Sequence, residues 1–557
     1  MIYIKHLSCF LGLLAVSMVC ACNKSSSDRT GDSTVGSSVS STVEAPATME
    51  QAGFTLDLDD VVATIDGLCY GVNEELIPES PFRRLGGNRM TGYNWEINSS
   101  NAGADHKHVS DRWLDKFAGL EEGDSRPAAW ILENLVQHLA ESADSLVTVP
   151  MAGYVVADAK GEVGRSKGAP SNRWVKVEPT KPGGNFGEPD LGDGRVYVDE
   201  QVAWLVAQAG AAADGGVKYY SLDNEPSIWS DTHPRIHPKK TDYKEVADKS
   251  IATAAAVLSV DPDAEIVGPA LYGWNGHVSL QNAASKNRLN KTHGSFSGYY
   301  LSRMREASEK QGKRLLHLFD FHWYPEATGG GQRIAVGEGR KDVSDVIVEA
   351  RLQAPRSLWD PTYLEESWIT DKNGGQPIQL IPRMQKIIQD NYPGTRFAIL
   401  EYSYGGGHHF SGGLATADVL GIFGRYGVAG CLWRVGDEND FEKAAFRLYL
   451  NYDGEGARFE EYAIGVPPVV AQNESIYAAR SEDKKTVTVV LINKRADNVL
   501  DKQVRLRGIQ DVPAIRAFRF GPGYSELRQV SEDLESSVGG FDIKCPPHTA
   551  TIVELTL

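Results

Sequence analysis

The stretch Tyr219-Tyr-Ser-Leu-Asp-Asn-Glu-Pro226 is a short apolar run that breaks directly into Asn-Glu-Pro. The run has the length and composition of a buried strand, and Pro226 prevents its continuation. A second run, Phe397-Ala-Ile-Leu-Glu-Tyr402, also carries a glutamate at its tip. Catalytic groups of α/β barrels lie at the carboxyl ends of the strands. In a barrel of this kind, the two stretches place the candidate site at Glu225 and Glu401.

Strand-like runs recur through the region that surrounds these stretches. They are Leu68–Asn73, Arg84–Asn88, Leu146–Met151, Lys218–Asp223, Ala264–Pro269, Leu315–Phe321, Arg396–Leu400 and Val428–Trp433. Helical patterns separate most of them, at Gln201–Ala213, Tyr243–Leu258, Tyr299–Gln311 and Ile378–Asp390. Strands that alternate with helices at these lengths are typical of a parallel sheet with crossover helices. The sequence therefore predicts an α/β protein with a (β/α)8 TIM barrel.

The C-terminal region has a different pattern, because strands and turns follow one another without helices. Thr486–Asn493 and Thr549–Leu557 are examples. Phe54–Asp59, near the other end, alternates apolar and polar residues as a half-buried antiparallel strand would. We expect it to pair with the C-terminal strands in a β-sandwich. The predicted ranges are 51–66 for this N-terminal strand, 67–455 for the barrel and 456–557 for the C-terminal sandwich.

The N-terminus predicts an export signal. Lys5 and His6 precede an apolar run, Leu7–Val19, that is short for a membrane span. The run closes on Val19-Cys-Ala-Cys22, which resembles the bacterial lipoprotein processing site. We expect a signal peptide at 1–21, lipidation of Cys22 and a Ser/Thr-rich tether at 22–50. The protein would then be anchored to the cell envelope, at the outer membrane or the cell surface; an ordinary secretory cut near Ala21 is the alternative.

Charge and cysteine content limit the partners and the cross-links. The chain has 57 Lys and Arg against 74 Asp and Glu, a formal net charge of −17, which argues against a nucleic-acid partner. Cys69, Cys431 and Cys545 remain after the N-terminal cysteines are set aside. An odd number favours buried thiols, with a bridge between two of them as the alternative. We expect a monomer whose partner is a polysaccharide.

Paired carboxylates at the tips of the fourth and seventh strands suit glycoside hydrolysis. One group protonates the departing oxygen, and the other attacks the sugar or activates water. A nucleophile must stay ionised, whereas the acid needs a pKa raised by burial and by the neighbouring charge. The alternative is that Glu225 and Glu401 are loop carboxylates that share no site.

Several longer motifs resemble glycoside hydrolase family 44. They are Arg84-Leu-Gly-Gly-Asn-Arg-Met-Thr-Gly-Tyr-Asn-Trp-Glu96, Tyr219–Pro226 with Trp229 and Thr232-His-Pro-Arg-Ile-His-Pro238, Ile399-Leu-Glu-Tyr402, and Phe446-Arg-Leu-Tyr-Leu-Asn-Tyr-Asp-Gly454. The resemblance spans roughly residues 52–557. It implies a barrel with a sandwich built from both termini, and retaining endo-cleavage of β-1,4-glucans such as cellulose derivatives, mixed-linkage glucan and xyloglucan. It also implies that Glu225 is the acid/base and Glu401 the nucleophile.

A sugar-binding surface combines flat aromatic rings with polar side chains, and such residues follow the predicted strands. Asn224, beside the acid, is placed to bind the sugar 2-hydroxyl. The other candidates for substrate binding are Arg84, Tyr93, Asn94, Trp95, Tyr154, Trp229, Tyr272, Trp274, His322, Tyr324, Trp368, Tyr402 and Trp433. Trp368 is included because of the family resemblance. Packing in the core is the alternative for each single aromatic residue.

Three other functions fit parts of the sequence. Asp320, His322 and the pair His408-His409 could hold a catalytic metal, but no HxxxH spacing or matched third ligand accompanies them. We expect no cofactor for catalysis, while a structural calcium stays open without a DxDxDG loop to locate it. A non-catalytic glycan-binding lipoprotein would use the same aromatic residues but has no need of the two glutamates. A hydrolase of xylan or mannan would keep the chemistry and change the polymer.

Overall fold

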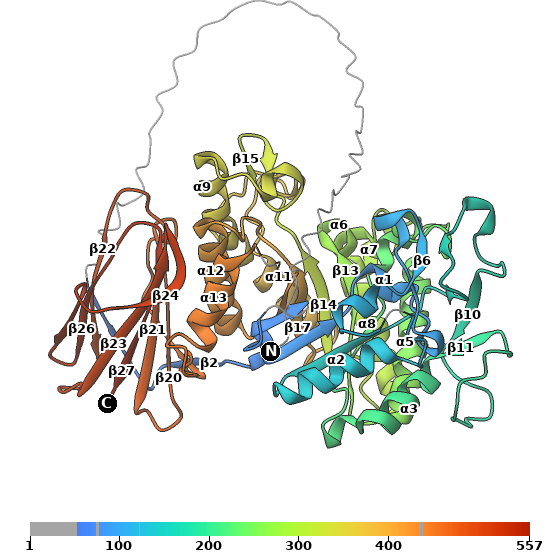
Figure 1. Cartoon of the computed structure of the whole chain (residues 1–557). Coiled ribbons are helices and arrows are strands. Elements are labelled where there is room, and N and C mark those ends of the chain that lie inside the picture. The colour runs from blue at the N-terminus through green and yellow to red at the C-terminus, as the bar shows by residue number, and fades with distance from the viewer. Residues whose placement is uncertain (1–52, 74–76, 122, 434–435, 437) are drawn as a thin grey trace, which may run out of the picture. The chain divides into compact units, whose positions relative to one another are not determined.

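The computed structural model describes residues 53–557 except 74–76, 122, 434–435 and 437 (Figure 1). The predicted signal peptide, Cys22 and the tether lie outside the described residues. Residues Gln51–Leu557 form one compact unit. No helix in the described part of the chain combines the length and the apolar character that a membrane span needs.

A closed barrel of parallel strands forms the first part of this unit, as predicted. Its strands in ring order are β3 (Gly71–Asn73), β4 (Phe82–Leu85), β7 (Asp144–Val149), β12 (Tyr219–Leu222), β13 (Glu265–Tyr272), β14 (Leu318–Trp323), β17 (Arg396–Tyr402) and β18 (Ala429–Trp433), which pairs with β3. All eight predicted runs became barrel strands. β12 is thus the fourth strand of the ring and β17 the seventh.

Apolar side chains from the strands fill the barrel interior. Phe82, Leu146, Tyr219, Leu318 and Leu400 are among the buried members of this inner cluster. Together they make the barrel a packed core rather than a pore. Polar functional groups are therefore left to the carboxyl ends of the strands.

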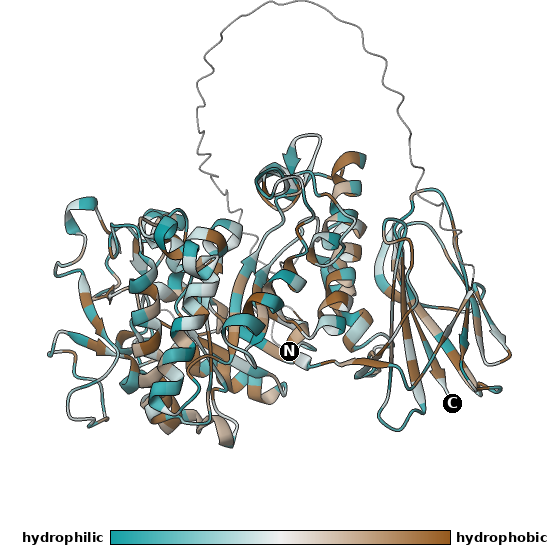
Figure 2. Cartoon of the chain, turned by 180° about the vertical axis from the view of Figure 1, so that it is seen from behind, coloured by the Kyte–Doolittle hydropathy of each residue, from teal (hydrophilic) through white to brown (hydrophobic). Residues whose placement is uncertain are grey.

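Helices surround the barrel, and the four that the sequence predicts are present. The longer helices are α2 (Ala129–Ala140), α3 (Val198–Ala209), α5 (Tyr243–Val260), α8 (Phe296–Gln311), α11 (Leu380–Asn391), α12 (Phe410–Tyr426) and α13 (Asp440–Leu450). Local signals set some of their ends: the Ser295 side chain accepts a hydrogen bond from the Gly298 amide at the start of α8, and Gly312 ends that helix in a left-handed conformation. Figure 2 shows hydrophilic residues on the loops and both hydrophilic and hydrophobic residues on the helices, of which α12 is buried along most of its length.

The connection between β14 and β17 is partly helical. It contains β15 (Thr328–Gly329), β16 (Gln332–Arg333), α9 (Asp345–Gln353) and α10 (Trp368–Lys372). Trp368 begins α10.

The C-terminal strands form two mainly antiparallel sheets, and each sheet also contains one strand from the N-terminal region. One sheet contains β1 (Gly53–Leu56), β22 (Leu500–Leu506), β26 (Gly540–Cys545) and β25 (Leu534–Ser537). The other contains β2 (Val61–Thr64), β19 (Tyr462–Ile464), β20 (Glu474–Arg480), β21 (Thr486–Asn493), β27 (Thr549–Thr556), β23 (Ala514–Gly521) and β24 (Tyr524–Val530). The sandwich built from both ends of the chain is therefore confirmed.

The direction predicted for the N-terminal strand was wrong. β1 pairs with β22 in parallel, for example Phe54 with Val504. Alternation of apolar and polar residues reports that one face of a strand is buried, and it carries no information on the direction of the neighbouring strand. β2, which the sequence analysis did not separate from β1, pairs with β19 in antiparallel fashion.

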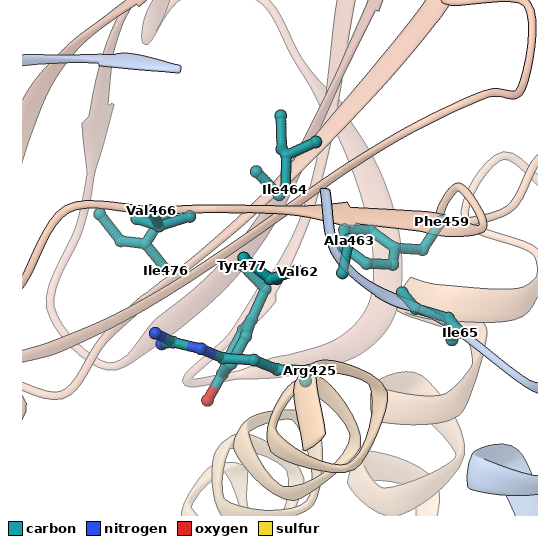
Figure 3. Close-up of a pocket in the computed structure, with 11 residues that line it drawn as sticks. Val62, Ile65, Arg425, Phe459, Ala463, Ile464, Val466, Ile476 and Tyr477 are labelled. Atoms are coloured by element: carbon teal, nitrogen blue, oxygen red, sulfur yellow. The ribbon is translucent and has the colours of Figure 1, made fainter. Parts of the chain in front are cut away.

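A buried polar contact joins the sandwich to helix α12 of the barrel. Asp418 forms an ion pair of 2.7 Å with Lys494 and accepts a 2.5 Å hydrogen bond from the Tyr477 hydroxyl. A cavity of about 20 Å³ lies nearby, with Ile464, Ile476 and Tyr477 on the sandwich side and Arg425 on α12 (Figure 3). Its size and apolar lining make it a packing gap at this junction rather than a ligand site.

The three cysteines in the described residues are buried and free. Cys69 and Cys431 belong to the barrel region, and Cys545 ends β26. The prediction of buried thiols without a disulfide framework is confirmed.

Candidate active site

Glu225 and Glu401 lie at the carboxyl ends of the fourth and seventh barrel strands. Glu225 follows β12 and is 6% exposed, and Glu401 is the next-to-last residue of β17 and is 7% exposed. Each has an oxygen that lies within 4.8 Å of an oxygen of the other and of a ring nitrogen of His322. The two glutamates therefore share one site, and the alternative of two unrelated loop carboxylates is wrong.

His322, on β14, lies between the two carboxylates. Its Nδ1 is 2.9 Å from Oε1 of Glu225 and 3.6 Å from Oε2 of Glu401. On the other side of the ring, Nε2 is 3.7 Å from Oδ2 of Asp320. The imidazole thus contacts the candidate acid directly and faces three carboxylates.

Arg84, on β4, connects the two candidate catalytic residues. Its guanidinium donates to Glu401 Oε2 at 3.0 Å, to Asn73 Oδ1 at 2.7 Å and to Asn224 Oδ1 at 2.9 Å. The Arg84 side chain is fully buried, so its charge acts on Glu401 with little screening by water. The guanidinium fixes the position of the carboxylate and stabilises its negative charge.

The second oxygen of Glu401 has its own donor. The Tyr324 hydroxyl donates to Oε1 at 2.7 Å. Burial raises the pKa of Tyr324 well above its usual value, and the charge of Glu401 adds to this effect, so the phenol keeps its proton. Both oxygens of Glu401 therefore accept hydrogen bonds, which fix the orientation of the carboxylate.

Burial and charge give Glu225 and His322 different proton affinities. Burial raises the pKa of Glu225, while the hydrogen bond and the charge of His322 lower it and the charge of Glu401 raises it. For His322, burial alone lowers the pKa, but the charge of Glu401 and the contacts with Asp320 and Glu225 outweigh it and raise the pKa to about 10. At neutral pH His322 is an imidazolium, and Glu225 retains a proton more readily than an exposed glutamate.

A strained turn carries Glu225. Asp223 and Glu225 have φ angles of 62° and 45°, in the left-handed region that side chains with a Cβ rarely adopt. Asp223 compensates by accepting hydrogen bonds from the amides of Met151 (2.5 Å) and Ala152 (3.0 Å) and from the Thr91 hydroxyl (2.6 Å). These contacts hold the turn in a conformation that would otherwise cost about 1 kcal/mol or more per residue.

The backbone before Glu401 is held from both sides. Asn73 Nδ2 donates to the carbonyl of Leu400 at 2.8 Å, and Asp320 Oδ1 accepts from the amide of Leu400 at 3.0 Å. The sequence alone indicated no role for Asn73 or Asp223, and it suggested Asp320 only as part of a metal site. Asn73 and Asp320 lie toward the carboxyl ends of predicted strands, so the rule that located Glu401 also applies to them.

Some predicted substrate-binding residues belong to this site or retain exposed surface. Arg84, Asn224, His322 and Tyr324 contact the glutamates or one another, as described above. Tyr272 is 41% exposed, and it pairs across β13 and β14 with His322, the residue that contacts Glu225. Tyr154, Trp368 and Trp433 are half-buried, and the Trp433 ring lies next to Gly87.

Other predicted residues are core residues in the structure. Tyr93, Asn94, Trp95, Trp229, Trp274 and Tyr402 are all buried. Asn94 donates to the carbonyl of Val156, and the Trp229 indole donates to the carbonyl of Asn224 and so supports the turn that carries Glu225. Strand-end position alone could not separate these rings from exposed ones, because loops fold back over the barrel rim. A ring without exposed surface offers no face to a sugar.

Glu225, His322 and Glu401 have the spacing of a possible metal site. Their charge environment argues for proton chemistry instead. His322 Nδ1 already lies 2.9 Å from Glu225, and the Arg84 guanidinium lies 3.4 Å from His322 Nε2 and 3.0 Å from Glu401. His408 and His409, the other pair considered, lie beyond the end of β17, where His408 is exposed.

Comparison with known proteins agrees with this geometry. The family model described as glycoside hydrolase family 44 matches residues 99–327. Endoglucanase A of Paenibacillus lautus is 43% identical over 524 residues, which cover 92% of this chain and 74% of that protein. The β-mannanase/endoglucanase A of Caldicellulosiruptor saccharolyticus is 40% identical over 506 residues, which cover 88% of this chain but 38% of that protein.

A solved structure extends the similarity to the whole fold. The family 44 xyloglucanase of Paenibacillus polymyxa, determined with xyloglucan, has a TM-score of 0.86 and 40% identity to this chain. The match covers 91% of this chain and 99% of that one, so it includes both the barrel and the sandwich. The chain therefore belongs to glycoside hydrolase family 44, and it is a glycoside hydrolase.

Proposed function

We propose that the protein is a retaining endo-hydrolase of β-1,4-glucan backbones, with Glu225 as acid/base and Glu401 as nucleophile. The separation of the two carboxyl groups carries the proposal. Their nearest oxygens lie within 4.8 Å. Retaining enzymes hold the two groups about 5–5.5 Å apart, whereas inverting enzymes need about 6.5–9.5 Å to fit a water molecule.

The first step assigns different roles to the two glutamates. Glu401, ionised and held by Arg84 and Tyr324, attacks the anomeric carbon while Glu225 gives its proton to the departing glycosidic oxygen. Because its pKa is raised, Glu225 retains that proton more readily than an exposed glutamate. The products of this step are a glycosyl ester on Glu401 and a free chain end.

The second step uses the change in charge that the first step causes. Esterification removes the negative charge of Glu401, which is one of the influences that raise the pKa of Glu225. The pKa of Glu225 therefore falls, and the ionised group can take a proton from water as that water attacks the ester. Because His322 stays beside Glu225, its positive charge favours the ionised form in this step.

Names of the relatives and the exposed aromatic residues support glucan as the substrate. The similar proteins are named endoglucanase and xyloglucanase. Tyr272, which is 41% exposed and is the strand partner of His322, is a candidate platform for a sugar ring. Cellulose derivatives, mixed-linkage glucan and xyloglucan are the proposed substrates. Mannan is a second candidate, because one relative is named as a β-mannanase as well as an endoglucanase.

Release of reducing sugar from a panel of polysaccharides tests the proposal. Wild type and Glu401→Gln are compared on carboxymethylcellulose, mixed-linkage glucan, xyloglucan, xylan and mannan. We expect wild type to shorten the glucans rapidly and Glu401→Gln to be inactive. NMR of the first product should show the β-anomer, as a retaining reaction requires. Wild type that binds these polymers but hydrolyses none would leave a non-catalytic binder, and an initial α-anomer would reject retention.

We also propose that Cys22 is lipidated and anchors the enzyme to the cell envelope, at the outer membrane or the cell surface. The support is the sequence alone, namely the apolar run and the Val19-Cys-Ala-Cys22 stretch that follows it. The Ser/Thr-rich residues 22–50 would then act as a tether between the lipid and the catalytic unit. An enzyme held in this way would act on polymer outside the cell.

A further inference from the structure

A groove of about 700 Å³ lies between the barrel and the sandwich, apart from the two glutamates. Its barrel side contains His409, Phe410 and Phe441, and its sandwich side contains Tyr524, Glu526 and Arg528. The sandwich residues belong to strand β24 of the β23–β24 hairpin. None of them takes part in the site described above.

The groove is on the catalytic face of the barrel. His409 and Phe410 follow β17, the strand that carries Glu401, and Phe441 is near the start of α13, which follows β18. Segments that follow barrel strands lie at the carboxyl end of the barrel, where the active site is. Phe410 is nine positions after Glu401, so its Cα lies no more than about 30 Å from that of Glu401. A polymer that occupies the active site could therefore also reach the groove.

Flat side chains that line the groove are held by stacking contacts, one of them with His548, which lies outside the lining. The Arg528 guanidinium lies over the Tyr524 ring at 4.4 Å, and the Phe410 ring stacks on His548 with centroids 4.7 Å apart and planes 23° apart. Stacking fixes the orientation of these planes, so each presents a preformed surface. Pyranose rings have apolar faces that bind such planes.

The polar side chains of the groove favour a neutral ligand that carries hydroxyl groups. Burial lowers the pKa of His409 to about 4, and nearby positive groups add to this, so the imidazole is neutral in the groove at physiological pH. Glu526 and Arg528 are exposed and contribute one charge of each sign. Their charges cancel, and both are strong hydrogen-bonding groups. A polyanion or a polycation would gain nothing here, whereas sugar hydroxyls can both donate and accept.

We propose that this groove binds a second segment of the glucan chain that the active site cuts. The inference rests on the proposed function for the choice of glucan. The groove would hold long polymers near the active site and have little effect on short oligosaccharides, because only a long chain can occupy both places. Once one segment of a chain is bound at the groove, the rest of the same chain is held at a high effective concentration near the active site. The affinity for polymer therefore increases without any new contact to the reacting sugar.

The test compares Tyr524→Ala with a matched control, Tyr462→Ala. Tyr462 lies on β19 of the same sheet, five strands away from β24, and it carries Arg480 over its ring at 4.9 Å. The control thus removes the same kind of stacked pair from outside the groove. Both substitutions are made in full-length Glu401→Gln protein, so that polymer is bound but not cut. Circular dichroism and thermal unfolding verify that each variant is folded.

Retardation in native gels that contain soluble xyloglucan or hydroxyethylcellulose measures binding. Saturating cellohexaose fills the active site, so the remaining retardation reports the groove. We expect about tenfold weaker retardation for Tyr524→Ala, the loss of one aromatic stacking contact, and no change for Tyr462→Ala. Arg528→Ala should weaken it in the same direction. Equal retardation of the parent, Tyr524→Ala and Arg528→Ala proteins would overturn the proposal, as would loss of all retardation on addition of cellohexaose.

Turnover separates this proposal from the proposed function. With Glu401 restored, Tyr524→Ala should retain kcat/KM on cellohexaose within about twofold and lose several-fold on polymer. An equal loss on both substrates would count against the groove. Wild type that hydrolyses no β-glucan, yet shows retardation that depends on Tyr524, would reject the proposed function and leave the groove as a glucan-binding site.

Discussion

Replacement of His322 by asparagine should move the basic limb of the pH–rate profile to higher pH. His322 is an imidazolium whose Nδ1 lies 2.9 Å from Glu225 Oε1, and it lowers the pKa of Glu225 against the effect of burial. A charge pair at this distance is worth about 6 kcal/mol at an effective dielectric constant of ~20. Hydrogen bonds to charged groups typically contribute about 1.5–3 kcal/mol net. At 1.36 kcal/mol per pKa unit, the loss of a net contribution of about 1.5–3 kcal/mol corresponds to a rise of about 1–2 units in the pKa of Glu225.

The direction in which the basic limb moves follows from the role proposed for Glu225. In the proposed mechanism protonated Glu225 is the active form in the first step, so kcat/KM falls as pH rises through its pKa. Removal of the imidazolium destabilises the ionised form, so the fall should occur about 1–2 pH units higher than in wild type. The substrate must have a sugar leaving group, such as cellohexaose. A dinitrophenyl cellobioside, whose leaving group needs no proton, should show no basic limb in kcat/KM.

His277→Asn is the matched control. His277 is also buried, but burial lowers its pKa to about 3, so it is neutral and its removal deletes no charge; its Nδ1 is 2.9 Å from the Ser297 hydroxyl. The basic limb should stay in place for this variant. If His322→Asn leaves the limb unchanged or moves it to lower pH, the electrostatic role assigned to His322 is wrong.

Glu225→Ala should lose about 10²- to 10⁴-fold in kcat/KM on glucan, retain activity on a dinitrophenyl glycoside, and form a β-glycosyl azide when azide is added. Glu401→Ala should give the α-azide instead, and a β-azide from it would mean that the two roles are reversed. Lys494→Met removes the ion-pair partner that lies 2.7 Å from the buried carboxylate of Asp418. The free energy of unfolding should fall by about 3 kcal/mol, and the thermal unfolding midpoint should fall with it. The value of kcat/KM on cellohexaose should stay within about twofold of wild type. A midpoint equal to that of wild type would show that the pair contributes little to the junction. Cys22→Ala should move full-length protein from the detergent phase to the aqueous phase in Triton X-114 partition of producing cells; partition into detergent by both forms would refute the lipid anchor.

Local patterns were sufficient to predict the architecture. Each barrel strand is a short apolar run bounded by polar or turn residues, and each predicted helix has its own periodicity, so neighbours in the sequence carry the signal. The same rule located Glu225 and Glu401, because their position at strand ends is a property of two short stretches. The direction of β1 was missed, since its partner β22 begins at Leu500, far along the chain.

The exposure of aromatic residues could not be predicted in this way. Tyr272 and Trp95 both follow the expected pattern of an aromatic residue after a strand, yet Tyr272 is 41% exposed and Trp95 is fully buried. Trp95 packs near Trp204, on a helix that lies more than a hundred positions away in the sequence. Whether a loop ring faces solvent depends on which distant segment covers it.

The sequence by itself determined the class of fold, the two glutamates and the kind of chemistry, because these depend on periodicity and on residue type at strand ends. Only the tertiary structure decided the electrostatics of the site. Arg84 reaches Glu401 across 317 positions, Asn73 holds Leu400 across 327, and His322 meets Glu225 across 97. Closure of the barrel brings these groups within hydrogen-bonding distance in a buried site, where charge interactions are strong. Proton affinities that depend on such distances and on burial cannot be obtained before the chain is folded.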